Sequence, residues 1–166
     1  MEQDVLFMKK ALELARRAYA INEVPVGCVI VREGKVIARG YNLRENRQQA
    51  TAHAEIVAIE KACRRVGYWR LNGCTLYVTL EPCPMCAGAI INARIDRVVF
   101  GAYDEKRGCC GSIYELTSDR RFNHLPAVTG GVLERECAQL MTDYFKLKRE
   151  ENRRRKAADT EEELSD

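Results

Sequence analysis

One histidine, one glutamate and two cysteines have side-chain types and spacings that suit metal-dependent hydrolysis. His53 and Glu55 lie two residues apart in Thr-Ala-His-Ala-Glu, and Cys83 and Cys86 form a C-x-x-C motif in Pro-Cys-Pro-Met-Cys. An imidazole and two thiolates are ligands of the right softness for zinc, and three protein ligands leave the fourth tetrahedral position open for water. Zinc lowers the pKa of such a water to about 7, so the pattern predicts hydrolytic chemistry at neutral pH.

A structural zinc site is the plain alternative for the same residues. Such a site normally has a second pair of Cys or His ligands at comparable spacing. Cys109 and Cys110 are adjacent and His124 stands alone, so the sequence offers no such pair. The side chain of Glu55 is expected to point from its helix on a different side from that of His53, and beside a zinc-bound water it could transfer protons. The four residues therefore favour a catalytic zinc site.

The elements that must position these residues alternate between helical and extended patterns. His53 and the two cysteines are expected in the first turns of two helices, whose N-termini favour thiolates and bound anions. Short apolar strands separated by helices favour an α/β fold in three layers, α/β/α, around a mixed sheet of about five strands. The predicted helices cover residues 3–20, 51–65 with Thr51 as cap, 84–92 and from 134 onward; the predicted strands cover 26–31, 36–41, 74–80, 97–101 and 127–133.

Length and composition fit one globular domain. The chain has 166 residues, of which 46% are hydrophobic and 31% charged, with a net charge of +3. We expect one domain over residues 1–156, including a basic C-terminal helix, and an acidic, disordered tail over residues 157–166. The N-terminus is acidic and no apolar run is long enough for a membrane span, which indicates a cytoplasmic protein with mostly free thiols.

The motif resembles a known enzyme family. His53-Ala54-Glu55 followed by Pro82-Cys83-Pro84-Met85-Cys86 is similar to the signature of the zinc-dependent cytidine and deoxycytidylate deaminases. Further segments make residues 4–150 resemble the tRNA-specific adenosine deaminases within that group: 23–27, 41–42, 76–83, 86–90 and 98–102.

The resemblance implies a cytidine-deaminase-like fold and a specific reaction. One Zn²⁺ per subunit would be held by His53, Cys83 and Cys86, with Glu55 as general acid and base. The reaction would be hydrolysis of the wobble adenosine of a tRNA anticodon loop to inosine, by a homodimer. The resemblance also implies a set of substrate contacts: Val24, Pro25, Asn42, Ala54, Asp104, Phe145, Lys148 and Arg149.

Two other functions remain open from the residues themselves. The same scaffold could deaminate a free nucleobase or nucleoside of the guanine or cytosine type, or the chain could be a non-enzymatic, zinc-stabilised RNA-binding module. Residues 146–156 contain seven basic and two acidic side chains, which would suit an RNA backbone, although such a run is more often a solvated face. Cys109 and Cys110 stand where the deaminases usually have small residues, and their role is open.

Overall fold

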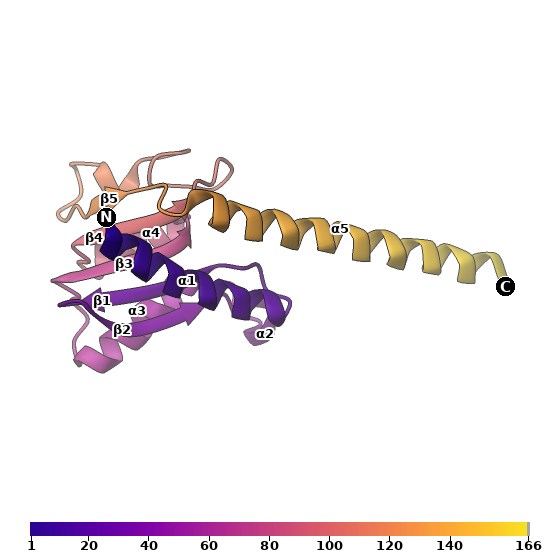
Figure 1. The fold of residues 1–166 in the computed structure, drawn as a ribbon, viewed down its shortest axis with the longest axis horizontal. Helices are drawn as coiled ribbons and strands as arrows, with labels where there is room; N and C mark the ends of the chain where they lie inside the picture. Colours follow the sequence, from indigo (N-terminus) through magenta and orange to yellow (C-terminus); the bar gives the residue numbers. More distant parts are fainter. Residues whose placement is uncertain (166) are drawn as a thin grey trace.

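A five-stranded mixed sheet forms the centre of the protein in a computed structural model that describes residues 1–165. Its strand order is β2-β1-β3-β4-β5 (Figure 1). β1 pairs antiparallel with both β2 and β3, whereas β3, β4 and β5 run parallel. The structure confirms the predicted mixed sheet of five strands: β1 Gly27–Arg32, β2 Lys35–Tyr41, β3 Cys74–Leu80, β4 Arg97–Ala102 and β5 Ala127–Thr129.

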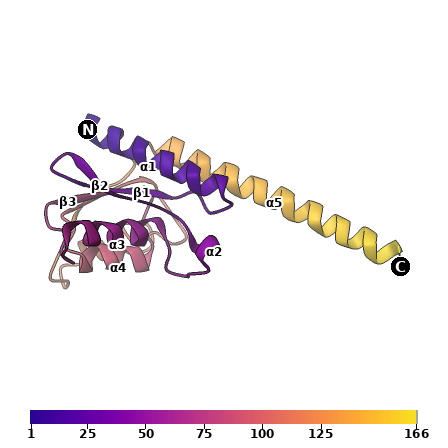
Figure 2. The ribbon, with the colours of Figure 1, turned by 90° about the horizontal axis from the view of Figure 1, so that it is seen from below.

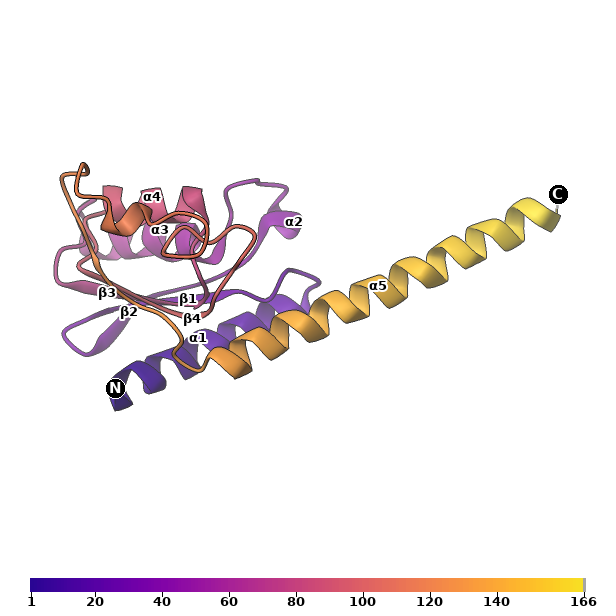
Figure 3. The same ribbon diagram turned by 90° about the horizontal axis from the view of Figure 1, so that it is seen from above.

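Helices cover both faces of this sheet and complete the predicted three-layer fold. Helix α1 (Glu2–Ala20) and the beginning of α5 (Glu134–Ser165) lie side by side on one face (Figure 2). Helices α3 (Ala54–Val66) and α4 (Pro84–Asn92) lie together on the other face (Figure 3). The N-terminal ends of α3 and α4 therefore lie next to each other.

The alternation of side chains along the central strands builds a separate hydrophobic core on each face. In β1, Cys28 and Ile30 are buried against α3 and α4, whereas Val29 and Val31 are buried against α1. This is the period-two pattern of a strand that is covered on both sides, and it explains why β1 is apolar from Cys28 to Val31.

Gly40 fixes the distance between β2 and α3. A Cβ atom at this position would clash with the carbonyl oxygen of Ala54 and would lie 2.7 Å from the backbone nitrogen of Ala58. The absence of a side chain lets the first turn of α3 rest directly on the sheet. Because His53 immediately precedes this turn, the same contact sets the height of His53 above the sheet.

Local boundaries differ from the predictions in three places. A short helix, α2 (Arg44–Arg47), forms within the polar segment expected to be a loop, and it ends where Gln48 takes a left-handed conformation. Thr51 does not cap α3, because His53 is extended and is itself the N-cap residue. β5 ends at Thr129, since Gly131 adopts a positive φ of 85°.

The C-terminal helix extends beyond the predicted boundary of the domain. Residues 157–165, which we expected to be disordered, continue α5 as it projects away from the sheet (Figure 1). Alanine and glutamate are good helix formers, which explains the continuation. Residue 166 lies outside the described residues. Within the described part of the chain, no helix is long and apolar enough to cross a membrane.

Candidate metal centre and substrate cavity

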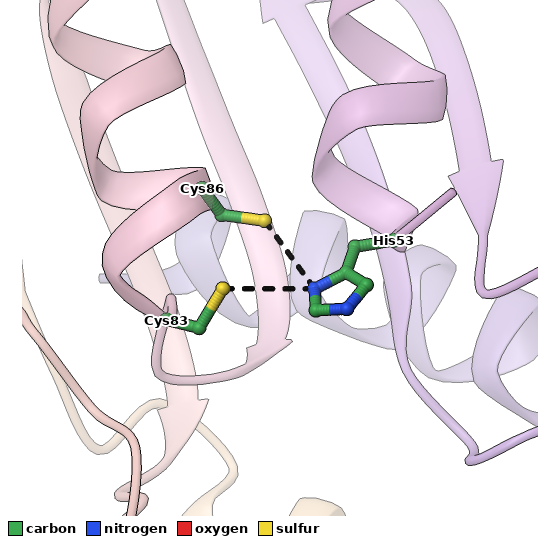
Figure 4. Close-up of side chains that lie close together, drawn as sticks. All are labelled: His53, Cys83 and Cys86. Carbon is green, nitrogen blue, oxygen red and sulfur yellow. Dashed lines mark hydrogen bonds between the residues drawn. The ribbon is translucent and has the colours of Figure 1, made fainter. Parts of the chain in front are cut away.

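The N-termini of α3 and α4 bring the three predicted zinc ligands together. His53 is the N-cap residue of α3, Cys83 is the N-cap residue of α4, and Cys86 lies in the first turn of α4. The imidazole Nδ1 of His53 lies 3.6 Å from the sulfur of Cys83 and 3.6 Å from that of Cys86 (Figure 4). Pro84 occupies the first turn of α4, where its missing N–H costs nothing.

These distances match what a tetrahedral zinc ion requires. The three ligand atoms lie within 4.8 Å of one another. Zn–N and Zn–S bonds of about 2.0 and 2.3 Å in a tetrahedral arrangement separate the N and S atoms by about 3.5 Å. The observed 3.6 Å leaves room for the ion at the centre without moving the backbone. Three ligands from two helix starts could therefore hold a zinc ion and leave its fourth position open, as in a catalytic site.

The three ligands share protons through short contacts. The thiol of Cys86 donates to the sulfur of Cys83, and together with His53 it lowers the pKa of Cys83 to about 4. The same hydrogen bond raises the pKa of Cys86 above its ordinary value, and the Cys83 thiolate raises the pKa of His53. A metal needs both sulfurs as thiolates, so metal binding must release protons from this cluster.

Glu55 lies beside the ligands but is not one of them. It is the second residue of α3, only 4% of its surface is exposed, and it lines the cavity in front of the cluster. Burial raises the pKa of its carboxyl group to about 7. A group with this pKa can accept and donate a proton at neutral pH, which is what a general acid and base must do.

A cavity of about 800 Å³ opens in front of His53, Glu55 and Cys83. It is large enough for a nucleotide-sized ligand. Six of the predicted substrate contacts line it: Val24, Asn42, Ala54, Asp104, Phe145 and Arg149.

The two remaining predicted contacts lie elsewhere. Pro25 is buried and is not among the residues that line the cavity. Lys148 lines an adjoining cavity of about 380 Å³. Its ammonium group donates to Asn22 Oδ1 at 2.9 Å and to Glu151 Oε2 at 3.0 Å, so it holds α5 to the body of the protein.

Asn42 is fixed at the cavity wall by two hydrogen bonds. Its Nδ2 donates to the carbonyl oxygen of Val24 at 3.3 Å, and its Oδ1 accepts from the backbone nitrogen of Arg44 at 3.2 Å. Only 7% of the residue is exposed. An amide held in this way presents its remaining hydrogen-bonding capacity in a fixed direction.

Sequence reasoning missed several residues at the cavity. Glu81 lines it although its surface is only 2% exposed, and Arg44, Tyr103, Lys106 and Arg107 also contribute to its walls. The position of Glu81 directly before Pro82 and Cys83 was a signal, but burial of a carboxylate is not visible in a sequence because glutamate is usually exposed.

Comparison with known proteins identifies the family. The family model described as the cytidine and deoxycytidylate deaminase zinc-binding region matches residues 1–102, which include every residue of the metal site. The chain belongs to the cytidine and deoxycytidylate deaminases. The zinc assignment made from the sequence is thereby confirmed, with His53, Cys83 and Cys86 as the candidate zinc site of this deaminase.

Curated relatives and solved structures agree with this assignment. A tRNA-specific adenosine deaminase of Bacillus subtilis (strain 168) is 51% identical over 158 residues, which cover 95% of this deaminase and 96% of the relative. A solved structure from a study of A-to-I editing by tRNA:A34 deaminases has a TM-score of 0.78 and 47% identity, covering 81% of this chain and 97% of that one. A guanine deaminase from Nitrosomonas europaea superimposes with a TM-score of 0.72 at 25% identity, covering 82% and 81%.

Proposed function

We propose that this chain is a tRNA-specific adenosine deaminase, which hydrolyses the wobble adenosine of a tRNA anticodon loop to inosine and releases ammonia. The observation that carries the proposal is the 51% identity to such an enzyme over nearly the whole length of both chains, together with the His53, Cys83 and Cys86 cluster. A base inside a duplex cannot reach a buried metal site, whereas an anticodon loop can turn a nucleotide into the cavity at low cost.

The chain's own residues supply ligands and proton transfer in this reaction. His53, Cys83 and Cys86 hold the zinc ion, which when bound activates water for attack on C6 of adenine. Glu55 takes a proton from the attacking water and delivers it to N1 of the base. It then takes the second proton from the hydroxyl group that the water has left on C6 and delivers it to the amino group; the C6–N bond breaks, C6=O forms, and ammonia leaves. Burial, which raises the pKa of its carboxyl group, favours the uptake of a proton by Glu55 before it passes the proton on.

The cavity walls hold the substrate nucleotide and its neighbours. Asn42 is oriented to hydrogen-bond the edge of the base, beside Val24 and the backbone of Ala54. Asp104, Phe145 and Arg149 line the same cavity, and we assign to them the contacts with the flanking nucleotides.

Cationic side chains of the cavity lining suit RNA phosphates, although carboxylates, among them Asp104 and Glu105, line the same cavity. Lys106, Arg107 and Arg149 are exposed residues of the cavity lining, and Arg44 is half-buried there. Cations at this place attract phosphates, which a free nucleobase does not have. The guanine deaminase with the same fold makes free-base deamination the alternative outcome of the test.

We also infer that the enzyme is a homodimer in which α4 faces a second copy. Support comes from α4, which contains no charged residue although its side chains at Pro84, Met85 and Ala89 are not buried. Large apolar side chains continue this surface at Ile113 and Tyr114, which are 45% and 65% exposed. Exposed apolar patches of this kind mark protein interfaces.

The dimer has a direct test. Met85→Glu should shift the molar mass measured by light scattering from that of a dimer toward that of a monomer. Lys9→Glu is the matched control, since Lys9 is exposed on α1, which covers the opposite face of the sheet. An unchanged mass in Met85→Glu would show that α4 does not form the interface.

We place the enzyme in the cytoplasm. All eight cysteines lie within the described residues and are free, which suits a reducing compartment where tRNA is also found. Fractionation of cells followed by immunoblotting would test this placement, and recovery of the protein from a secreted fraction would contradict it.

The reaction is tested with purified zinc-loaded protein and a short anticodon stem-loop with adenosine at the wobble position. Inosine should form at the wobble position. The same stem-loop with guanosine at the wobble position is the matched control and should stay unchanged. Guanine, cytosine and their nucleosides are tested in parallel, and faster turnover of one of them would favour the free-base alternative.

A further inference from the structure

Two buried carboxylates beside the cavity are bonded to backbone N–H groups rather than to cations. Glu81 is 2% exposed and Glu23 is 1% exposed, and in the described part of the chain neither forms an ion pair. Burying a carboxylate is costly unless hydrogen bonds compensate for its lost hydration. The groups that donate hydrogen bonds to these two carboxylates therefore show which segments each carboxylate holds in place.

Glu81 is hydrogen-bonded to the loop that forms one wall of the cavity. Its Oε1 accepts from the backbone nitrogen of Asp104 at 3.3 Å and from the hydroxyl of Ser112. Its Oε2 accepts from the backbone nitrogens of Cys110 and Ser112, each at 3.1 Å. One side chain thus ties together both ends of the segment from residue 104 to residue 112.

The loop is packed tightly around this carboxylate. A Cβ atom at Gly108 would clash with the carboxylate of Glu81 and would lie 2.6 Å from the carbonyl oxygen of Asp104. The backbone nitrogen of Cys109 also donates to the carbonyl oxygen of Pro82 at 2.9 Å. The loop is therefore attached to both residues that precede the zinc ligand Cys83.

The residues that the loop holds are those that face the substrate. Five consecutive residues, Tyr103 to Arg107, line the cavity. Within the loop, Asp104 Oδ1 accepts from the backbone nitrogens of Lys106 and Arg107, at 3.1 and 3.2 Å. Since Glu81 anchors the backbone of Asp104, a displacement there would pass to the basic side chains of Lys106 and Arg107.

We propose that Glu81 is a positioning residue that fixes the place of the cavity wall formed by residues 103–107 relative to the metal site. It acts through the loop rather than on the reacting atoms. The inference deepens the proposed function, on which it rests, because it assigns to Glu81 the binding of the RNA that flanks the target nucleotide. It also explains why a buried charge is retained there: a carboxylate can accept four hydrogen bonds, which no neutral side chain of the same size can do.

The isosteric variant Glu81→Gln should remove one specific hydrogen bond, the one that the backbone N–H of Asp104 donates. An amide has only one acceptor oxygen. In the best orientation of the glutamine side chain, this oxygen still accepts from the backbone N–H groups of Cys110 and Ser112, and the NH₂ group then faces Asp104. The hydroxyl of Ser112 can rotate to accept, but the N–H of Asp104 cannot. Hydrogen exchange should therefore accelerate at the amide of Asp104 and remain slow at Cys110. Glu81→Ala should accelerate exchange at all three backbone amides.

Glu23 provides a matched control for this measurement. Its carboxylate accepts from the backbone nitrogens of Glu45 and Asn46, each at 2.9 Å, and so holds α2 rather than the loop. Glu23→Gln is the same chemical change at an equally buried site. Its faster exchange should be confined to residues 45 and 46. If Glu23→Gln also loosened Asp104, general destabilisation rather than positioning would explain the effect, and the inference would be overturned.

Kinetics separate positioning from support of the metal site. Glu81→Gln should raise KM for the anticodon stem-loop about tenfold, the cost of roughly one net hydrogen bond, while kcat and the zinc content change by less than about twofold. Ser112→Ala, which leaves three backbone donors on the carboxylate, should stay within about twofold of the wild type. Loss of zinc, or a fall in kcat with unchanged KM, would overturn the inference.

The proposed function and the positioning role of Glu81 can fail separately. If the wild-type protein formed no inosine, the proposed function would fail, whereas the exchange experiment would still decide whether Glu81 holds the loop. If the wild type were active and Glu81→Gln changed neither KM nor exchange at Asp104, the positioning inference alone would fail.

Discussion

Replacing Gly40 with alanine should weaken zinc binding although Gly40 does not touch the metal. Its new Cβ would lie 2.7 Å from the backbone nitrogen of Ala58, about 0.7 Å short of the 3.4 Å at which ordinary Cβ contacts begin. β2 is paired with β1 along its length, so α3 must yield by a comparable amount. His53 begins this helix and would move with it.

The size of this movement decides the effect on the metal. Zinc–ligand distances in functional sites vary by only about 0.2 Å, so a shift of roughly 0.7 Å must be absorbed by distorting the site. We expect zinc affinity to fall by about 10- to 100-fold, the range found when the support of a ligand is disturbed. Crowding of the core should also lower the free energy of unfolding by about 1–3 kcal/mol.

Competition with a chromogenic chelator measures the zinc affinity, and thermal unfolding measures the stability. Gly88→Ala is the matched control: it lies within α4, where an added Cβ would meet no atom of its own subunit within 4 Å, and it should leave zinc affinity unchanged. Zinc binding by Gly40→Ala as tight as that of the wild type would refute the claim that this contact sets the position of His53.

Three further predictions concern stability, metal and RNA. Arg97 lowers the pKa of Asp4, to which it donates two hydrogen bonds. Arg97→Ala should therefore reduce the free energy of unfolding by about 1–3 kcal/mol at neutral pH. Denaturant titrations should show this difference at every pH above the ordinary pKa of aspartate, and the difference should disappear as the pH falls through the lowered pKa of Asp4. Removal of zinc by a chelator should abolish activity and lower the melting temperature, and added zinc should restore both, as followed by calorimetry. Replacing Arg149 and the arginines at 153–155 with glutamine should make the plot of log affinity for tRNA against log salt concentration less steep. The slope, measured by fluorescence anisotropy, should change by about 0.7 to 0.9 for each RNA phosphate that these arginines neutralise in the wild type.

The sequence predicted the elements whose signals are local and repetitive. The apolar stripe of α1 and the β-branched residues of β1, β2 and β4 are such signals, and each element lies within about two residues of its predicted place. The zinc ligands could be predicted because histidine and cysteine have few other uses at such spacing. α2 was missed because four residues are too few for a periodic pattern.

Features that depend on tertiary contacts were beyond the reach of the sequence. Thr51 looked like a helix cap, but the chain needs His53 in that position to direct its ring toward α4. Pro25 was expected to line the cavity, but it is buried, and its neighbours Val24 and Val26 line the cavity instead. The buried carboxylate of Glu81 is explained only by the backbone donors that converge on it from residues distant in sequence.

The most direct test of the role of Glu55 is the behaviour of Glu55→Gln with an anticodon stem-loop that carries adenosine at the wobble position. We expect the variant to keep one zinc ion per subunit and to bind the RNA like the wild type. Its rate of inosine formation in a single turnover should fall by about 100- to 10,000-fold, because the general acid and base has been removed. Loss of zinc from the variant, or inosine formation at the wild-type rate, would contradict the role assigned to Glu55.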